Sequence, residues 1–175
     1  MGNFIDDSLG RTGRILRGNR FKSTIFFPSV IVPGDAESKS TFYCMSTNVP
    51  TQDIGKIPIP QNGGIVTQVP GDPVEPPDWT VTVMADPDMT LYRTIERWKQ
   101  YCASALTGLR ANDLTSFGNA EVQLLDGLNL PVQTWELLKI YPMTISEIAL
   151  SKEDRDTYLQ FDVTFCINTV QTNLI

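Results

Sequence analysis

The sequence of 175 residues predicts a mainly β fold, an antiparallel β-sandwich or barrel with one flanking α-helix. Three patterns support this prediction. Trp79, Val81 and Val83 alternate with threonines, and the same two-residue period runs through residues 158–167. This period is typical of half-buried strands. Between these two segments, apolar residues recur at spacings of three and four over residues 91–105, which predicts an amphipathic helix.

The chain begins with an expected N-terminal arm, residues 1–20, ahead of a single β domain, residues 21–175. Glycines interrupt any regular element in the arm, and arginines recur at three-residue intervals, namely Arg11, Arg14, Arg17 and Arg20. Two interpretations stay open: the arm docks on an acidic neighbouring surface, or it is a solvated terminus. Insertion of the arm into nucleic acid is less favoured because no later segment continues the basic patch.

Two strands are expected next. Alternation places Ser23, Ile25 and Phe27 on one face of the first strand. A turn or loop around Pro33-Gly34-Asp35 follows, and the second strand is expected from Thr41 to Thr47.

A hairpin is expected between Ile54–Pro60 and Ile65–Val69. The turn, Gln61-Asn62-Gly63-Gly64, contains residues that accept a positive φ, which hairpin turns require. Prolines in the first arm make it an irregular or edge strand, since proline donates no main-chain hydrogen bond. The proline-rich segment from Pro70 to Pro77 then forms a stiff connection.

The strand at residues 79–84 leads directly into the helix. Pro87 ends the strand, Asp88 is placed to cap the first helical amides, and Gly108 is placed to end the helix. The apolar stripe of this helix packs on the sheet. The expected core comprises Trp79, Val81, Val83, Leu91, Ile95, Trp98, Phe161, Val163 and Phe165.

After the helix, residues 109–119 are polar and are expected to form a surface loop that meets partners. Ala120–Leu125 and Pro131–Tyr141 are expected to pair across Asp126-Gly127. Tyr141-Pro142 should end the second of these strands. A short strand from Thr144 to Leu150, a charged turn over residues 151–156 and the strand at residues 158–167 complete the chain.

The residue types argue against an enzyme, and no catalytic, cofactor-binding or metal-binding residue is expected. The chain has no histidine, the usual general base and the commonest ligand for transition metals. Its glycines form neither a phosphate-binding loop nor a dinucleotide fingerprint. A pair of carboxylates brought together by folding remains open. The net charge of -6 and pI near 4.6 disfavour a general nucleic-acid binder, which needs clustered cations.

Hydropathy and cysteine usage indicate a soluble protein made in the cytoplasm, with no membrane anchor. The sequence contains no apolar run of membrane-spanning length and no signal peptide. Cys44, Cys102 and Cys166 are widely spaced in apolar contexts, which favours reduced core cysteines. A disulfide between subunits stays open.

Three segments resemble the tail tube proteins of contractile-tailed (myovirus) bacteriophages. They are the Asp-Trp-Thr-Val-Thr-Val-Met run at residues 78–84, the helix containing Trp98, and residues 132–137 continuing to Tyr141-Pro142. Their order and distances match over most of the chain from Phe21 to Asn168. Residues 1–20 and the loop around residues 30–39 match least.

The resemblance implies a structural virion protein whose hexameric rings stack helically into the inner tail tube, through which DNA passes. Strands from six subunits would close a continuous inner barrel. The implied partners are the tail sheath protein, the baseplate hub or tube initiator, the tail terminator, the tape measure protein, and transiting DNA bound without sequence specificity. The implied location is the virion tail, assembled in the host cytoplasm.

Two sets of residues are candidates for these roles. A lumen that lets DNA slide should lack cations, and the expected lumen-facing residues are Gln52, Asp53, Glu121, Gln123 and Glu136. Contacts between subunits or with the sheath are assigned to Arg11, Arg14, Arg17, Arg20, Arg110, Asn112 and Asp113. The alternative for the first set is ordinary solvent-facing strand positions.

Other functions remain open. A tube initiator of the baseplate and the secreted tube protein of type VI secretion systems share the implied fold class. A monomeric β-sandwich that binds sugar or peptide would need exposed aromatic side chains at its loops. Trp79 and Trp98 are expected to be buried, which counts against that reading.

Overall fold

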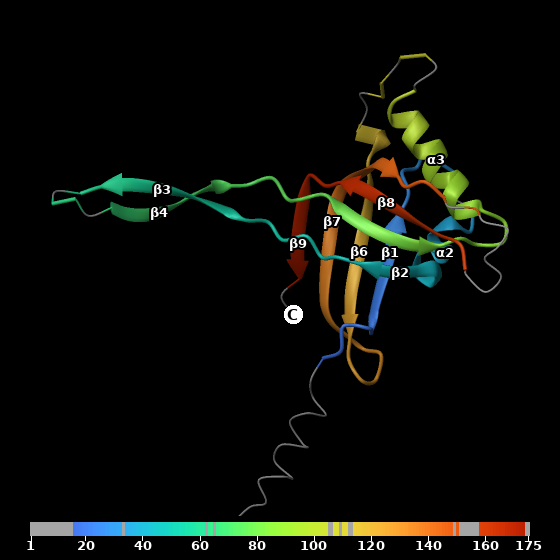
Figure 1. Ribbon diagram of the computed structural model, residues 1–175, viewed down its shortest axis with the longest axis horizontal. Coiled ribbons are helices and arrows are strands. Elements are labelled where there is room, and N and C mark those ends of the chain that lie inside the picture. The colour runs from blue at the N-terminus through green and yellow to red at the C-terminus, as the bar shows by residue number, and fades with distance from the viewer. Residues whose placement is uncertain are drawn as a thin grey trace, which may run out of the picture.

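The computed structural model describes residues 16–32, 34–61, 63–64, 66–104, 107–108, 110–111, 114–148, 150 and 158–173 (Figure 1). Over these residues the fold is mainly antiparallel β, as predicted, with a second helix that was not predicted. The elements are β1 (Phe21–Phe26), α2 (Ala36–Tyr43), β2 (Cys44–Thr47), β3 (Ile54–Pro60), β4 (Val66–Pro73), β5 (Trp79–Met84), α3 (Thr90–Cys102), the 3-10 helix η1 (Leu114–Ser116), β6 (Gly118–Leu125), β7 (Pro131–Ile145), β8 (Gln160–Cys166) and β9 (Thr169–Asn173).

Two half-sheets share the long strand β7. Its first part pairs with β6 and β9, giving the order β1-β6-β7-β9, and its last part pairs with β8, giving β7-β8-β5-β2. Between the two parts, Lys139 has a positive φ of 55° and the register with β6 shifts. The Lys139 amide donates to the side chain of Asn119, and Asn168 donates to the Lys139 carbonyl. These bonds hold the bend at which the strand passes between half-sheets.

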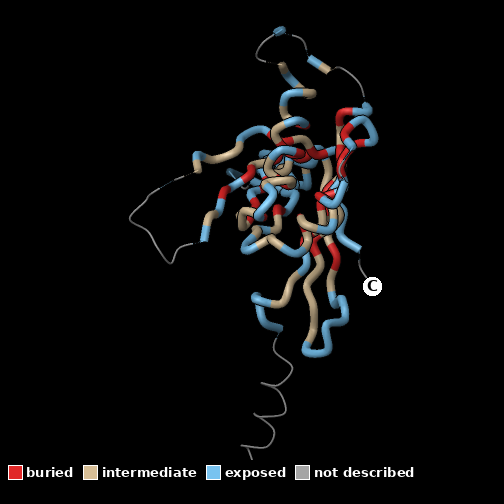
Figure 2. The backbone as a smooth tube through the Cα atoms, turned by 90° about the vertical axis from the view of Figure 1, so that its right-hand side faces the viewer, coloured by how far each residue is buried: buried red, intermediate tan, exposed pale blue. Residues whose placement is uncertain are grey.

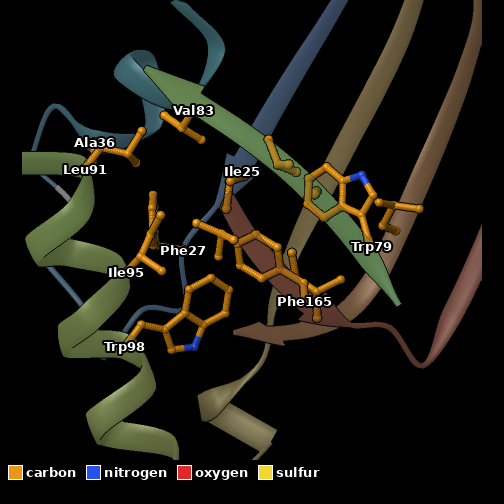
Figure 3. Close-up of a cluster of buried hydrophobic side chains, with 14 of the residues drawn as sticks. Ile25, Phe27, Ala36, Trp79, Val83, Leu91, Ile95, Trp98 and Phe165 are labelled. Atoms are coloured by element: carbon orange, nitrogen blue, oxygen red, sulfur yellow. The ribbon is translucent and has the colours of Figure 1, made fainter. Parts of the chain in front are cut away.

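The core lies between the half-sheets and α3 (Figure 3). All nine residues expected in the core are at most 1% exposed. Trp98 reaches from α3 to Phe165 and Phe27, with ring centroids 5.9 and 5.5 Å apart. Both buried tryptophans also satisfy their indole N–H groups, Trp98 on the Ser116 carbonyl and Trp79 on the Thr47 hydroxyl. Figure 2 shows buried positions concentrated in this region of the molecule.

The strand expected from Thr41 to Thr47 is confirmed only from Cys44 onward, as β2. Its first three residues belong to helix α2, which spans residues 36–43. One side of α2 packs against β1. The Ser40 hydroxyl accepts the Ile25 amide at 3.1 Å and donates to the Glu37 carbonyl, and Thr41 bonds Thr24. Contacts with a strand distant in sequence therefore override the local β propensity.

The residues expected to cap and to end α3, Asp88 and Gly108, are both wrong. Asp86, not Asp88, caps the helix, and its carboxylate accepts the Thr90 and Leu91 amides at 3.0 and 3.4 Å. The carboxylate also accepts a hydrogen bond from Lys39 of α2 at 2.8 Å. The helix ends at Cys102, well before Gly108, because the next residue is extended and pairs in an isolated bridge.

Strand β7 does not end at Tyr141-Pro142 but continues to Ile145. Pro142 is buried opposite Phe165, and a register shift directly after it absorbs the missing amide. The separate strand expected from Thr144 to Leu150 is therefore wrong. Its first two residues belong to β7, and residues 146–148 are not in a strand. The charged turn expected over residues 151–156 lies outside the described residues.

Candidate functional site

The outer face of the half-sheet β1-β6-β7-β9 carries a cluster of polar side chains. Glu121 on β6 lies directly opposite Glu136 on β7. Gln123 donates a hydrogen bond to Glu121, and Asn173 of β9 donates to Glu136 at 2.7 Å. Their neighbours Ala120, Val122 and Leu137 are at most 2% exposed and point into the core. The alternation of β6 and β7 thus separates an apolar inner face from a polar outer face.

Few charged side chains lie on the four strands of this half-sheet. Among their described residues, Glu121 and Glu136 supply two carboxylates, and the lysines are Lys22, opposite Gln123, and Lys139 at the bend of β7. The remaining outward positions on β9 are polar and uncharged, as in Gln171, which lies opposite Glu136. A polyanion near this face would find few phosphate-binding groups.

Both edges of this half-sheet expose main-chain groups. Strand β1 pairs with β6, and β9 pairs with β7, and neither has a second strand partner among the described residues. Helix α2 covers β1 at Ile25, whose amide binds Ser40. Since residues alternate in direction along an antiparallel strand, Phe21 and Ser23 also direct their amides away from β6. Open edges of this kind can accept a strand from another chain.

The β3–β4 hairpin projects from the body of the molecule (Figure 1). Strand β4 runs to Pro73, so the prediction of a hairpin is confirmed, whereas the stiff connection expected from Pro70 begins only after β4. Ile57 and Val69 lie opposite each other, and Ile59 lies two residues further along the same face. These three side chains are 53%, 36% and 47% exposed. A two-stranded ribbon is marginally stable alone in water, so this face needs a covering surface.

Gln52 and Asp53 are not brought together with Glu121, Gln123 and Glu136. They are exposed residues just before β3, and the Asp53 carbonyl accepts the Val74 amide at 2.8 Å at the base of the hairpin. Their role as lumen residues stays a prediction.

The residues expected to contact other subunits or the sheath are separated along the chain. Arg17 and Arg110 are exposed, and Arg20 donates from its guanidinium to the Asp126 carbonyl at 3.1 Å. The remaining ones, Arg11, Arg14, Asn112 and Asp113, lie outside the described residues. Their contacts with other subunits or the sheath stay predictions.

The three cysteines are half-buried and form no disulfide within the chain. Burial raises the pKa of the Cys44 thiol to about 11 and also raises the pKa of the Cys102 thiol. Both thiols are therefore protonated and weakly nucleophilic near neutral pH. The described segments contain no grouping of three potential metal ligands. No helix in them is long and apolar enough to cross a membrane.

Sequence reasoning missed two parts of this surface, the β9 edge and the apolar face of the hairpin. Strand β9 is short and polar, with no clear period, so no local signal marks it. The exposed isoleucines of β3 alternate with proline and lysine, and this pattern could have indicated one apolar face.

Comparison with known proteins gives consistent matches. Residues 17–171 match the family described as phage tail tube protein. The chain is 29% identical to the tail tube protein of Serratia phage KSP90 over 158 residues, which cover 88% of this chain and 86% of the relative.

Two solved structures share the fold at low sequence identity. The sheath-tube complex of the extracellular contractile injection system PVC has a TM-score of 0.65 at 12% identity, covering 92% of this chain and 93% of that chain. The tube terminating cap of the anti-feeding prophage has a TM-score of 0.66 at 11% identity, covering 92% of each chain.

Proposed function

Because this chain belongs to the phage tail tube protein family, we propose that six copies form a ring and that rings stack helically into the inner tube of a contractile tail. The protein is a structural tail component, and this family is not enzymatic. In this proposal the assembled tube conducts phage DNA into the host.

The observation that carries the proposal is the half-sheet with two open edges and a polar outer face. If β9 of one copy pairs with the free part of β1 in the next copy, each such contact covers one exposed edge on each of the two copies. A closed ring covers every exposed edge, because a cyclic arrangement has no terminal strand. The outer faces of the half-sheets then form one continuous wall around a channel.

The side chains on that wall suit the passage of DNA. Glu121 and Glu136 repel phosphates, and the amides of Gln123 and Asn173 are tied to these carboxylates. A wall rich in lysine and arginine would instead hold DNA through salt-dependent phosphate contacts. The tape measure protein and the DNA would occupy the same lumen, without sequence-specific binding.

Further partners follow from proteins of the same fold. One similar chain was solved in a sheath-tube complex and another in a tube terminating cap. We therefore assign a sheath protein, a terminator and a baseplate tube initiator as partners of this chain. Arg17, Arg20 and Arg110 remain candidates for these contacts. The assembled tube belongs to the virion tail and forms in the host cytoplasm.

Electron microscopy of the purified protein over a range of concentrations tests the proposal. Six-fold rings or hollow rods are the expected result. Rings that never stack into rods would favour a tube initiator or a terminator. A uniform monomer at high concentration would contradict ring formation and favour a monomeric binding module.

A variant lacking residues 1–20 tests the proposed role of the N-terminal arm. It should remain folded but stack poorly, because the arginine-bearing arm is assigned to contacts between rings or with the sheath. Unchanged tube length and yield would remove that assignment.

A further inference from the structure

A pocket of about 650 Å³ lies at one end of the β6–β7 strand pair, next to the end of α3. Its volume is in the range of pockets that bind sizeable groups, roughly 300 to 1,000 Å³. The Phe117 and Tyr141 rings meet edge to face in its lining, and Met143, also part of the lining, is 47% exposed. Lys99 and Arg110 add two cations. The pocket therefore suits an apolar occupant that carries no cation of its own.

The opposite end of the same two strands is a tight turn that presents two leucines. Leu128 and Leu130 are 79% and 58% exposed. Their amides donate to the Asp126 carboxylate at 2.7 and 2.9 Å, and the Asp126 amide donates to the Leu130 carbonyl at 2.9 Å. The Arg20 guanidinium donates to the Asp126 carbonyl. Because these bonds fix the turn in advance, little backbone freedom is lost when the leucines bind a partner.

The course of β6 and β7 separates the turn from the pocket. Phe117 directly precedes β6, and Pro142 lies near the end of β7, whereas the turn joins the other ends of the two strands. In Figure 1 the turn lies at the bottom of the molecule, and α3 lies toward the top. The eight residues of β6 span about 27 Å at roughly 3.4 Å per residue. The turn therefore cannot reach the pocket of its own chain.

Ring formation would place these two ends on the two faces of a ring. The proposed ring joins copies through their lateral edges, β1 and β9, and strands in a closed barrel typically tilt by about 35 to 45° from its axis. The strand ends then face the neighbouring rings. Stacking in one direction brings the turn end of each copy to the pocket end of a copy in the next ring. Because the two surfaces differ, such a contact repeats along an open filament.

We propose that the turn bearing Leu128 and Leu130 inserts into this pocket of a copy in the adjacent ring. The inference rests on the proposed tube and assigns a ring-to-ring contact within it. Insertion covers both leucines and the exposed part of Met143, so apolar burial stabilises the stack. The contact repeats in every copy around a ring, so even a weak single contact holds two rings together.

Substitutions on both sides test the contact. Leu128→Lys and Met143→Lys should leave six-fold rings intact but raise the protein concentration needed for rods roughly tenfold or more, because each loses apolar burial. Lys99 and Arg110 also repel the new cation. Phe42→Lys is the matched control, since Phe42 is 79% exposed on α2. This control should form rods like the unmodified protein, and all three variants should unfold close to its melting temperature in dilute solution.

The sign of the charge gives a result that a purely structural role of the turn would not. Leu128→Glu would place a carboxylate near Lys99 and Arg110 of the next ring, so it should impair rods less than Leu128→Lys does. Combination with Arg110→Glu should narrow or reverse this order, because the new carboxylate then meets another one. An order that Arg110→Glu leaves unchanged would contradict the pocket as the receiving site.

A disulfide identifies the two partners. Cys102 lines the pocket and is half-buried. Leu128→Cys, combined with Cys44→Ser and Cys166→Ser, should therefore form a disulfide with Cys102 of another copy when rods are oxidised with copper phenanthroline. Rings kept below the stacking concentration should not crosslink. Phe42→Cys in the same background should not crosslink to Cys102 in rods either.

The outcomes separate this contact from the tube itself. Rods that tolerate Leu128→Lys, or rods in which Leu128→Cys forms no disulfide with Cys102, would overturn the contact while leaving the tube proposal intact. Loss of rings as well as rods in Leu128→Lys would also overturn it as a contact between rings. Unmodified protein that forms neither rings nor rods would contradict the proposed function instead.

Discussion

Replacing Asp86 with asparagine should destabilise the fold more than any comparable change at a neighbouring acid. The Asp86 side chain is fully buried and accepts hydrogen bonds from Lys39, Thr90 and Leu91. Asp88 is 80% exposed and lies 3.6 Å from the Lys39 ammonium. Asp88→Asn is therefore a matched control for the loss of one carboxylate beside the same lysine.

The expected loss can be worked from these contacts. Asparagine keeps one acceptor oxygen and caps a helix about as well as aspartate, so the expected loss comes from the bond to the Lys39 ammonium. A hydrogen bond to a charged partner contributes about 1.5 to 3 kcal/mol, and Asp86→Asn should therefore cost about 3 kcal/mol at this buried site. For a chain of this size, that loss lowers the melting temperature by about 6 to 12 °C. Asp88→Asn should cost less than about 1 kcal/mol, since exposed ion pairs contribute little.

Thermal and urea unfolding of dilute, unassembled protein measures both variants. Equal losses for Asp86→Asn and Asp88→Asn, or a larger loss for Asp88→Asn, would refute the assignment of Asp86 as the buried partner of Lys39. Circular dichroism at 222 nm should show the loss of helix together with the loss of stability.

The stability should also depend on pH through Asp86. Burial opposes its ionisation, but the bonds from Lys39, Thr90 and Leu91 outweigh burial and lower its pKa. The unfolded chain has an ordinary aspartate pKa near 3.9, so the stabilisation is complete above about that pH. It is lost as the pH falls through the folded pKa. Asp86→Asn should flatten this acid dependence, and an unchanged profile would contradict it.

Three further variants probe the strands and the proposed lumen. Gly118→Ala should cost about 1 to 3 kcal/mol in urea unfolding, because its Cβ would lie 2.7 Å from the Trp98 ring, and a neutral result would contradict this packing. Lys139→Gly should cost nothing or add up to about 1 kcal/mol, since a φ of 55° strains lysine, and a clear loss would contradict this. The double variant Glu121→Lys, Glu136→Lys should still form tubes, but these tubes should retain DNA, and the retention should weaken as the salt concentration rises. Retention that salt does not affect would contradict the proposed lining.

Part of the candidate site could be predicted from the sequence. Glu121, Gln123 and Glu136 are expected in the hairpin over residues 120–141, and the structure groups them on the outer face of β6 and β7, where their role as lumen residues stays a prediction. Gln52 and Asp53 precede a hairpin whose direction relative to the sheet has no local signal. The groove that Phe21, Met45, Val122 and Trp135 help to line draws these residues from β1, β2, β6 and β7, so no single segment could indicate it.

The sequence by itself determined the strands at Trp79–Met84 and Gln160–Cys166, the buried face of α3 and the turn of the β3–β4 hairpin. Local periodicity and turn chemistry act over a few residues, so one segment carries the whole signal. Only the tertiary structure decided that residues 36–43 are helical, that Asp86 rather than Asp88 caps α3, and that β7 bends at Lys139. Each of these features depends on hydrogen bonds or packing between residues far apart in the chain, which no local pattern records.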